Sequence, residues 1–72
     1  MPNSFIERIR QAIRDVLTEN KNKPLELLEL TMLVDKKLSD GEIDSKLVKT
    51  IVDQMVAGFQ ILESDDKFSL NN

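Results

Sequence analysis

The chain has 72 residues, of which 40% are hydrophobic and 32% are charged, and it contains no His, Cys, Trp or Tyr. Without Cys and His this chain by itself cannot build a zinc ribbon, an Fe–S cluster, a disulfide framework, a Cys nucleophile or an imidazole base. A chain of this length forms one domain, residues 1–72, whose core is too small to enclose a catalytic cavity. We therefore expect a non-enzymatic protein without cofactor or metal that works by contact with another macromolecule.

The charge and the hydropathy of the chain exclude further classes. Ten basic against 13 acidic residues give a formal net charge of −3, which opposes non-specific binding to nucleic acid or anionic lipid. Apolar runs are only a few residues long, far below the roughly 18 needed to span a bilayer, and no signal-peptide pattern opens the chain. These features predict a cytoplasmic protein that has no membrane partner.

The first predicted helix begins at Phe5, because Ser4 and Glu7 have the S-x-x-E spacing of a capping box. It should end within residues 20–24, because Pro24 disfavours helical dihedrals at Lys23. The apolar residues of this helix recur at helical spacing and predict one buried stripe, formed by Phe5, Ile6, Ile9, Ala12, Ile13, Val16 and Leu17.

Residues 25–38 are predicted to form a second helix. Its buried stripe consists of Leu27, Leu30, Val34 and Leu38. Leu28, Met32 and Leu33 lie outside this stripe, so the helix is apolar on more than one side. Such a helix is either packed between other elements or exposed at an interface.

The second half of the chain predicts a turn, a third helix and a hairpin. The turn covers residues 39–42, Asp44 is the expected N-cap, and Ile43 with Val48 would form a hydrophobic staple. Gly58 should end the helix. Its apolar residues are Leu47, Val48, Ile51, Val52, Met55, Val56 and Phe59. Residues 59–63 and 67–70 then predict two strands around a turn at 64–66, with Ile61, Phe68 and Leu70 covering the helices.

Three helices followed by a two-stranded hairpin is the order of a winged helix, a mainly α fold of the α+β class. The Lys23-Pro24 step, the Leu- and Glu-rich segment 25–30 and the aromatic-x-aliphatic return strand Phe68-Ser69-Leu70 make the chain resemble the HARE-HTH type of winged helix. That type includes the amino-terminal domain of the bacterial RNA polymerase delta subunit. The resemblance implies a transcription-associated context, with RNA polymerase or other nucleic-acid machinery as partner. The delta subunit's acidic tail has no counterpart here, so nothing that depends on that tail is implied.

The favoured function is binding of a protein partner. Leu28 and Met32 would provide an apolar surface, extended by Leu62, which should point away from Ile61 and the core. The acidic side chains of the wing, Glu63, Asp65 and Asp66, would meet a basic partner. Two alternatives stay open: Leu28 and Met32 only cover the ends of the core, or the second helix forms a homodimer.

The second function considered is that of a winged-helix DNA-binding transcriptional regulator. Its third helix would place Lys46 and Lys49 on phosphates and Thr50 or Gln54 on base edges, with Lys67 on the wing. From residue 39 onward, however, the chain has three basic and seven acidic residues, a net charge of −4, whereas the first 38 residues carry +1. Because phosphate contacts dominate affinity for nucleic acid, this acidic half disfavours DNA.

Two other charged segments are candidates for binding sites, one for nucleic acid and one for calcium. Basic residues also follow the first helix and the turn after it, at Arg8, Arg10, Arg14, Lys21 and Lys23. Acidic residues interleave with them, which favours a mixed-charge helix face over a nucleic-acid stripe. The Asp-rich segment 35–46 fails the spacing of a calcium-binding EF-hand, because Asp40 stands where Gly is required and Lys46 where Glu is required.

Overall fold

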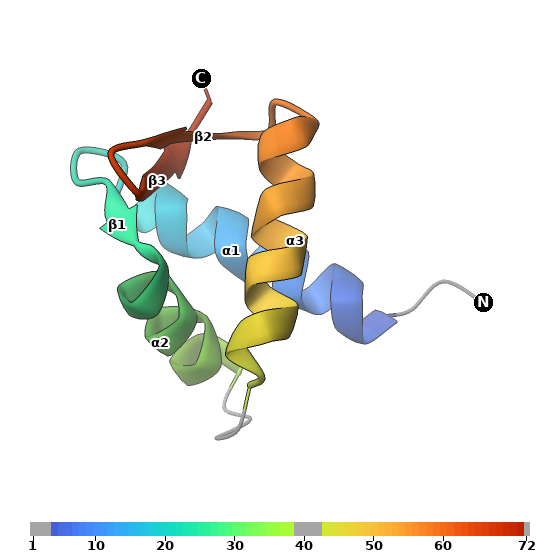
Figure 1. Ribbon diagram of the computed structural model, residues 1–72. Helices are drawn as coiled ribbons and strands as arrows, with labels where there is room; N and C mark the ends of the chain where they lie inside the picture. The colour runs from blue at the N-terminus through green and yellow to red at the C-terminus, as the bar shows by residue number, and fades with distance from the viewer. Residues whose placement is uncertain (1–3, 39–42, 72) are drawn as a thin grey trace.

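The computed structural model of the protein describes residues 4–38 and 43–71, which form a winged-helix-like α+β fold (Figure 1). The elements in chain order are α1 (Ser4–Glu19), β1 (Leu25–Glu26), α2 (Leu27–Leu38), α3 (Ser45–Ala57), β2 (Ile61–Ser64) and β3 (Lys67–Leu70). The predicted fold class, mainly helical with a C-terminal hairpin, is confirmed. The predicted turn at residues 39–42 lies outside the described residues.

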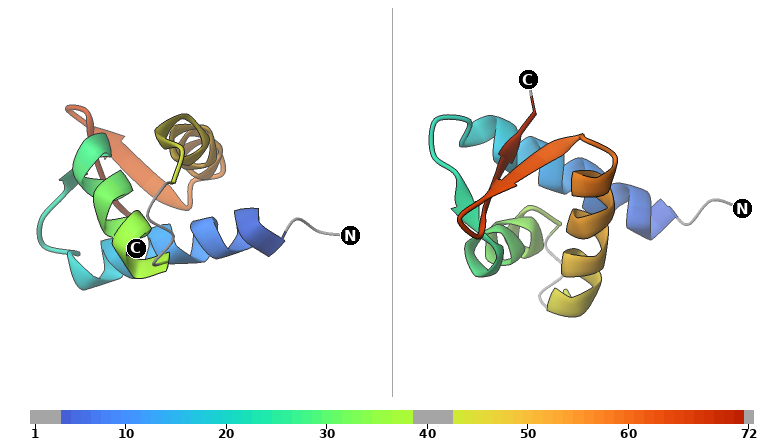
Figure 2. Two further views of the ribbon diagram at one scale, coloured as in Figure 1. Left: turned by 90° about the horizontal axis from the view of Figure 1, so that it is seen from below. Right: turned by 45° about the horizontal axis from the view of Figure 1, so that its top comes forward.

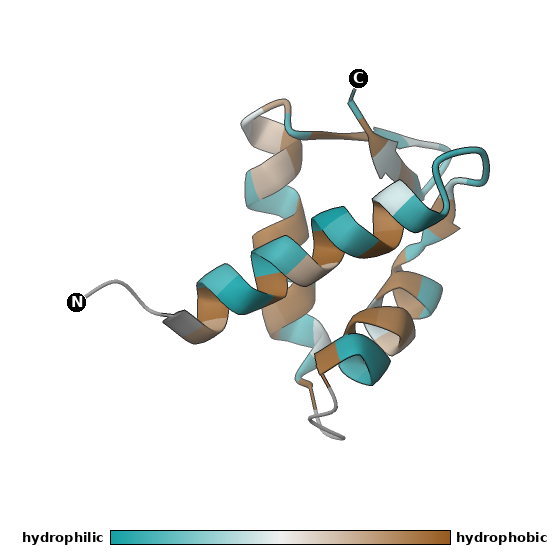
Figure 3. Ribbon diagram, turned by 180° about the vertical axis from the view of Figure 1, so that it is seen from behind, coloured by the Kyte–Doolittle hydropathy of each residue, from teal (hydrophilic) through white to brown (hydrophobic). Residues whose placement is uncertain are grey.

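Helix α1 alternates hydrophobic and hydrophilic residues at helical spacing along its length (Figure 3). The stripe from Ile9 to Leu17 is at most 2% exposed. The helix ends where the backbone N and the side-chain Nδ2 of Asn20 both donate to the Val16 carbonyl, at 3.1 and 2.8 Å. The prediction that Phe5 belongs to the buried stripe is wrong: this residue is 36% exposed, because the first turn of α1 extends past α3 (Figure 1).

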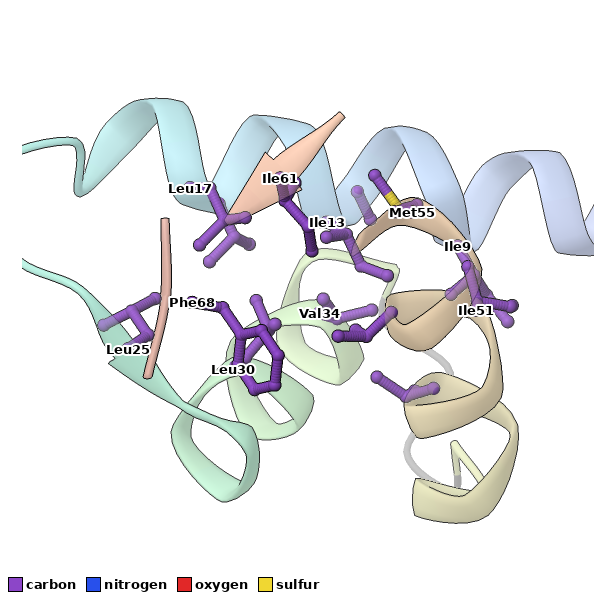
Figure 4. Packing of buried hydrophobic residues seen from close by; sticks show 14 residues of the cluster. Ile9, Ile13, Leu17, Leu25, Leu30, Val34, Ile51, Met55, Ile61 and Phe68 are labelled. Atoms are coloured by element: carbon purple, nitrogen blue, oxygen red, sulfur yellow. The ribbon is translucent and has the colours of Figure 1, made fainter. Parts of the chain in front are cut away.

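The start of the predicted second helix is wrong, because residues 25 and 26 form strand β1. Leu25 pairs with Phe68 and Glu26 with Lys67 of β3, in antiparallel register. Leu25 is 1% exposed, and in Figure 4 it lies close to Phe68 at one end of the core. The helical pattern could not reveal this strand, because its partner lies about 40 residues further along the chain.

The sheet is antiparallel with strand order β1-β3-β2, and a two-residue turn connects β2 to β3. Both turn residues, Asp65 and Asp66, have positive φ values of 53° and 62°, as a type I′ hairpin turn requires. The two faces of β2 differ as predicted, since Ile61 is fully buried whereas Leu62 is 45% exposed. Because Ser64, Lys67 and Glu26 share one row across the strands, the hairpin tip lies beside β1 (Figure 2).

The core forms where α1, α2 and α3 meet the inner face of the sheet (Figure 4). Leu30 and Val34 of α2 are fully buried, as the second-helix stripe predicts, while Leu27, Leu33 and Leu38 pack against the core from its edge. The buried apolar residues are Ile9, Ala12, Ile13, Val16, Leu17, Leu25, Leu30, Val34, Val48, Ile51, Val52, Met55, Ile61 and Phe68.

Helix α3 begins and ends as predicted, with Asp44 as its N-cap and Gly58 as its C-cap. Asp44 caps it, with its carboxylate accepting from the Lys46 backbone N at 2.9 Å. At the other end Gly58 has an ordinary φ of −87°, and the left-handed residue is Phe59, with φ 60°. Phe59 N donates to the Val56 carbonyl and Gln60 N to the Met55 carbonyl, at 3.0 and 2.9 Å, which are the two hydrogen bonds of a Schellman motif. Phe59 therefore belongs neither to the apolar stripe of α3 nor to strand β2, and both predictions that included it are wrong.

Candidate interaction surfaces

The largest exposed apolar side chains of α2 are Leu28 and Met32, which are 71% and 64% exposed. They are four residues apart, so they lie one above the other on the outer face of the helix. The core-facing side of α2 is already filled by Leu30 and Val34. We call Leu28 and Met32 the α2 patch; the prediction that both lie outside the core stripe is confirmed.

The acidic wing tip, Asp65 and Asp66, belongs to the same end of the molecule as the α2 patch. Lys67, which follows the tip, pairs with Glu26 of β1, and Leu28 comes two residues after Glu26. Glu29 is also exposed here, and its carboxylate lies 3.8 Å from the Lys23 ammonium. The start of α2 and the acidic wing tip thus lie at the same end of the molecule, and Glu26 and Glu29 flank Leu28 in the sequence.

The two other residues of the predicted protein-binding set do not share one face. Leu62 is on the outer face of the sheet, in register with Ser69, whereas Glu63 is in register with the buried Phe68. Because successive residues of a strand point to opposite faces, Leu62 and Glu63 cannot contact one flat partner surface together. Both are exposed, but only Leu62 lies on the outer face.

The residues proposed for DNA contact are exposed, and several already have partners within the protein. Lys49 Nζ donates to the Asp53 carboxylate at 3.2 Å, and Thr50 Oγ1 donates to the Lys46 carbonyl at 3.0 Å. Lys67 lies across from Glu26 in the sheet. Gln54 is exposed and also lines a hollow between α1 and the end of α3. The five residues do not form one basic reading face.

A polar hollow of about 170 Å³ lies between α1, the end of α3 and the turn after it. Its lining residues are Glu7, Arg10, Arg14, Gln54, Met55 and Gln60, and we call it the α1–α3 hollow. Arg10 donates to the Glu7 carboxylate, and Arg14 Nη2 donates to Gln60 Oε1 at 2.6 Å. Sequence reasoning missed this site. The spacing of Arg10 and Arg14, four residues apart, could have indicated that they share a helix face. That Gln60 lies next to them depends on the tertiary structure.

Two shallower hollows flank Lys37, where α1 meets α2, with volumes of about 290 and 190 Å³. Lys37 Nζ donates to the Glu19 carboxylate at 2.7 Å and ties the two helices together. This hydrogen bond raises the pKa of the exposed Lys37 ammonium above its usual 10.5, assisted by the negative charges of Glu19 and Asp15. The arrangement is that of a structural ion pair.

Metal and membrane sites are not found in the part of the chain that the structure describes. Within residues 4–38 and 43–71 no three acidic side chains gather closely enough to hold a metal ion. No helix in these ranges has the length and apolar character that crossing a bilayer requires.

The comparison with known proteins is negative. No protein-family model, curated protein or solved structure matches the chain. The α2 patch, the acidic wing tip and the α1–α3 hollow are therefore the features from which a function can be inferred.

Proposed function

We propose that this protein is a small, non-enzymatic winged-helix interaction module that binds a basic surface of another protein. The contact is made by the α2 patch and the acidic wing tip, with Leu62 at its margin. The observation that supports the proposal is the strand register. It brings the acidic wing tip beside β1, the strand that leads directly into α2 and its exposed pair Leu28 and Met32.

The two parts of this surface have different energetic roles. Burying a Leu or Met side chain in a partner's pocket yields about 1.5–3 kcal/mol, which offsets part of the entropy lost on association. The unbranched Met32 side chain adapts to an uneven pocket. The carboxylates at this end of the molecule add long-range attraction to a basic partner, which speeds encounter more than it strengthens the final complex.

DNA is the second candidate ligand, and charge disfavours it. Asp44 and Asp53 balance the two lysines of α3, and the wing has three carboxylates against Lys67. Lys49 is already paired with Asp53. A duplex approaching α3 and the wing would meet a surface with net negative charge, so the release of counterions that drives binding to DNA would be small.

The winged-helix-like order of elements and the resemblance to the HARE-HTH type favour a partner that belongs to transcription. RNA polymerase and other nucleic-acid machinery display basic surfaces, which are the chemistry that this acidic, partly apolar face would recognise. The remaining alternative is a homodimer through α2, in which two copies of the α2 patch would cover each other.

The proposal is tested with the variant Leu28→Asp and the matched control Asn22→Asp, which adds the same charge at an exposed turn position. Affinity capture from extract of the native host, with quantification of each captured protein, should recover a basic protein with the wild type and with Asn22→Asp. Leu28→Asp should reduce its recovery about tenfold, because a charge in an apolar pocket costs about 1.4 kcal/mol or more. Raising the salt concentration should weaken the capture.

Two measurements separate the alternatives. Binding of labelled duplex DNA that falls with salt and is lost in Lys46→Glu or Lys49→Glu would show a DNA-binding protein and overturn the proposal. If the wild type sediments as a dimer and Leu28→Asp as a monomer, a second copy of the chain covers the α2 patch.

A further inference from the structure

Another exposed apolar residue, Phe59, follows the C-cap of α3, and this end of α3 lies away from α2 (Figure 1). Its side chain is 76% exposed, more than that of Leu28. Its backbone is in the left-handed region, with φ 60°, where side chains with a Cβ are rarely found. Gly would serve the Schellman motif better at this position. An exposed aromatic ring held in an unfavourable backbone conformation is typical of a residue that contacts a ligand.

The residue that follows Phe59 in the chain lines the α1–α3 hollow. Gln60 Oε1 accepts from Arg14, so the Arg14 guanidinium is bound to a neutral amide. Among the described residues no carboxylate lies within ion-pair distance of Arg14, whereas Arg10 is paired with Glu7. The hollow therefore has a net charge of +1, with the amides of Gln54 and Gln60 as further hydrogen-bonding groups.

We propose that Phe59 and the α1–α3 hollow together bind an acidic peptide segment of a protein partner. One Asp or Glu carboxylate of the peptide enters the hollow and accepts hydrogen bonds from the fork of Arg14 N–H donors, which matches carboxylate geometry. A neighbouring apolar side chain of the peptide packs on the Phe59 ring. This site is separate from the α2 patch and does not depend on the function proposed for that patch.

The charge of the hollow favours a single carboxylate over nucleic acid. One incoming carboxylate neutralises the +1 of the hollow while Glu7 stays paired with Arg10. A polyanion would bring further phosphates against Glu7 and against a chain of net charge −3, which weakens its binding. The exposed ring also suits an apolar side chain next to the acid.

The test is an NMR titration of the full chain with the capped dipeptide acetyl-Phe-Glu-amide at millimolar concentration. We expect saturable shifts of the Arg14 Nε–H signal and of the Gln54 and Gln60 side-chain amides. The matched probe acetyl-Phe-Gln-amide should bind at least about fivefold more weakly, because it lacks the charge. Phe59→Gly should weaken binding of the acidic dipeptide about fivefold, through loss of the ring contact.

The Phe59→Gly variant keeps the test independent of stability, because it is expected to fold at least as well as the wild type. Leu28→Asp should leave the titration unchanged, which separates this site from the α2 patch. Equal shifts with the acidic and amide dipeptides, or no shift of the hollow's signals, would overturn the proposal. Tighter, salt-dependent binding of oligothymidylate at the same signals would also overturn it and assign the site to single-stranded nucleic acid.

Discussion

Asp44 and Phe59 lie just outside the two ends of α3. Asp44 suits its backbone conformation, whereas Phe59 does not. Asp44 is the residue type that an N-cap favours, and its carboxylate satisfies a backbone donor of the first turn. Phe59 occupies the left-handed position of the Schellman motif, where a Cβ costs roughly 1–2 kcal/mol. Gly58 is under no such constraint, because its φ is ordinary and an added Cβ would meet the Gln54 carbonyl oxygen at 3.5 Å, a normal contact.

Phe59→Gly should therefore raise the free energy of unfolding by about 1 kcal/mol, since it removes the left-handed penalty and little burial is lost. For a domain of this size that corresponds to a rise in Tm of roughly 4–8 °C, measurable by thermal and urea denaturation. Phe59→Ala is the control, because it removes the ring but keeps the Cβ, and it should change stability little. A lower Tm for Phe59→Gly would show that the ring contributes more packing than its exposure indicates.

The three-stranded sheet has β2 at one edge, where an open strand would invite pairing with another chain. Glu63 lies on the inner face of this strand, in one row with Leu25 and Phe68. A charged side chain that points inward at a sheet edge discourages further strands from adding there. Glu63 is thus better explained as protection of the edge than as part of the partner-binding face.

Glu63→Val should let the edge strand β2 pair with strands of other molecules. Val extends the apolar row of Leu25 and Phe68 and favours strand structure, so the variant should self-associate at tens of micromolar. Analytical ultracentrifugation would detect this as a rise in weight-average mass with concentration. Glu63→Gln, which stays polar but loses the charge, should associate less. A Glu63→Val protein as monomeric as the wild type would contradict this role.

At the scale of the whole molecule, long-range polar contacts tie α1 to both of its neighbours. Lys37 of α2 binds Glu19 at the end of α1, and Arg14 binds Gln60 beyond α3. Both contacts are on the surface, so each adds little stability compared with the buried apolar core. One carboxylate oxygen of Asp35 is buried without a hydrogen-bond donor among the described residues.

The Lys37–Glu19 pair should make the free energy of unfolding decrease with pH in the alkaline range. The folded-state pKa of Lys37 is raised by the hydrogen bond that it donates to Glu19, so the stabilisation is complete below the usual pKa of 10.5. It is lost as pH rises through the higher folded-state value. Urea denaturation from pH 9 upward should show a steeper loss for the wild type than for Lys37→Gln. Lys36→Gln, which alters the adjacent exposed residue, should retain the wild-type slope, and the difference should shrink at high salt.

Local patterns predicted the features that depend on neighbouring residues. The buried stripes of α1 from Ile9 to Leu17 and of α3 from Val48 to Met55, the Asp44 cap, the Asp65-Asp66 turn and the opposite faces of Ile61 and Leu62 all follow from spacing and residue type. Strand β1 was missed because Leu25 and Glu26 fit the helical pattern that continues into α2. The backbone of Phe59 was missed because Gly58 is the more obvious helix terminator.

The amino-acid sequence alone established the class of this protein, three amphipathic helices and a hairpin with an acidic second half, because periodicity and charge are properties of the chain itself. Tertiary structure decided which exposed residues are neighbours. Pairing of β1 with β3 places the start of α2 and the acidic wing tip at one end of the molecule, and packing of α3 on α1 brings Gln54 and Gln60 to Arg10 and Arg14. Such neighbours are far apart along the chain, and only burial of the shared core holds them together.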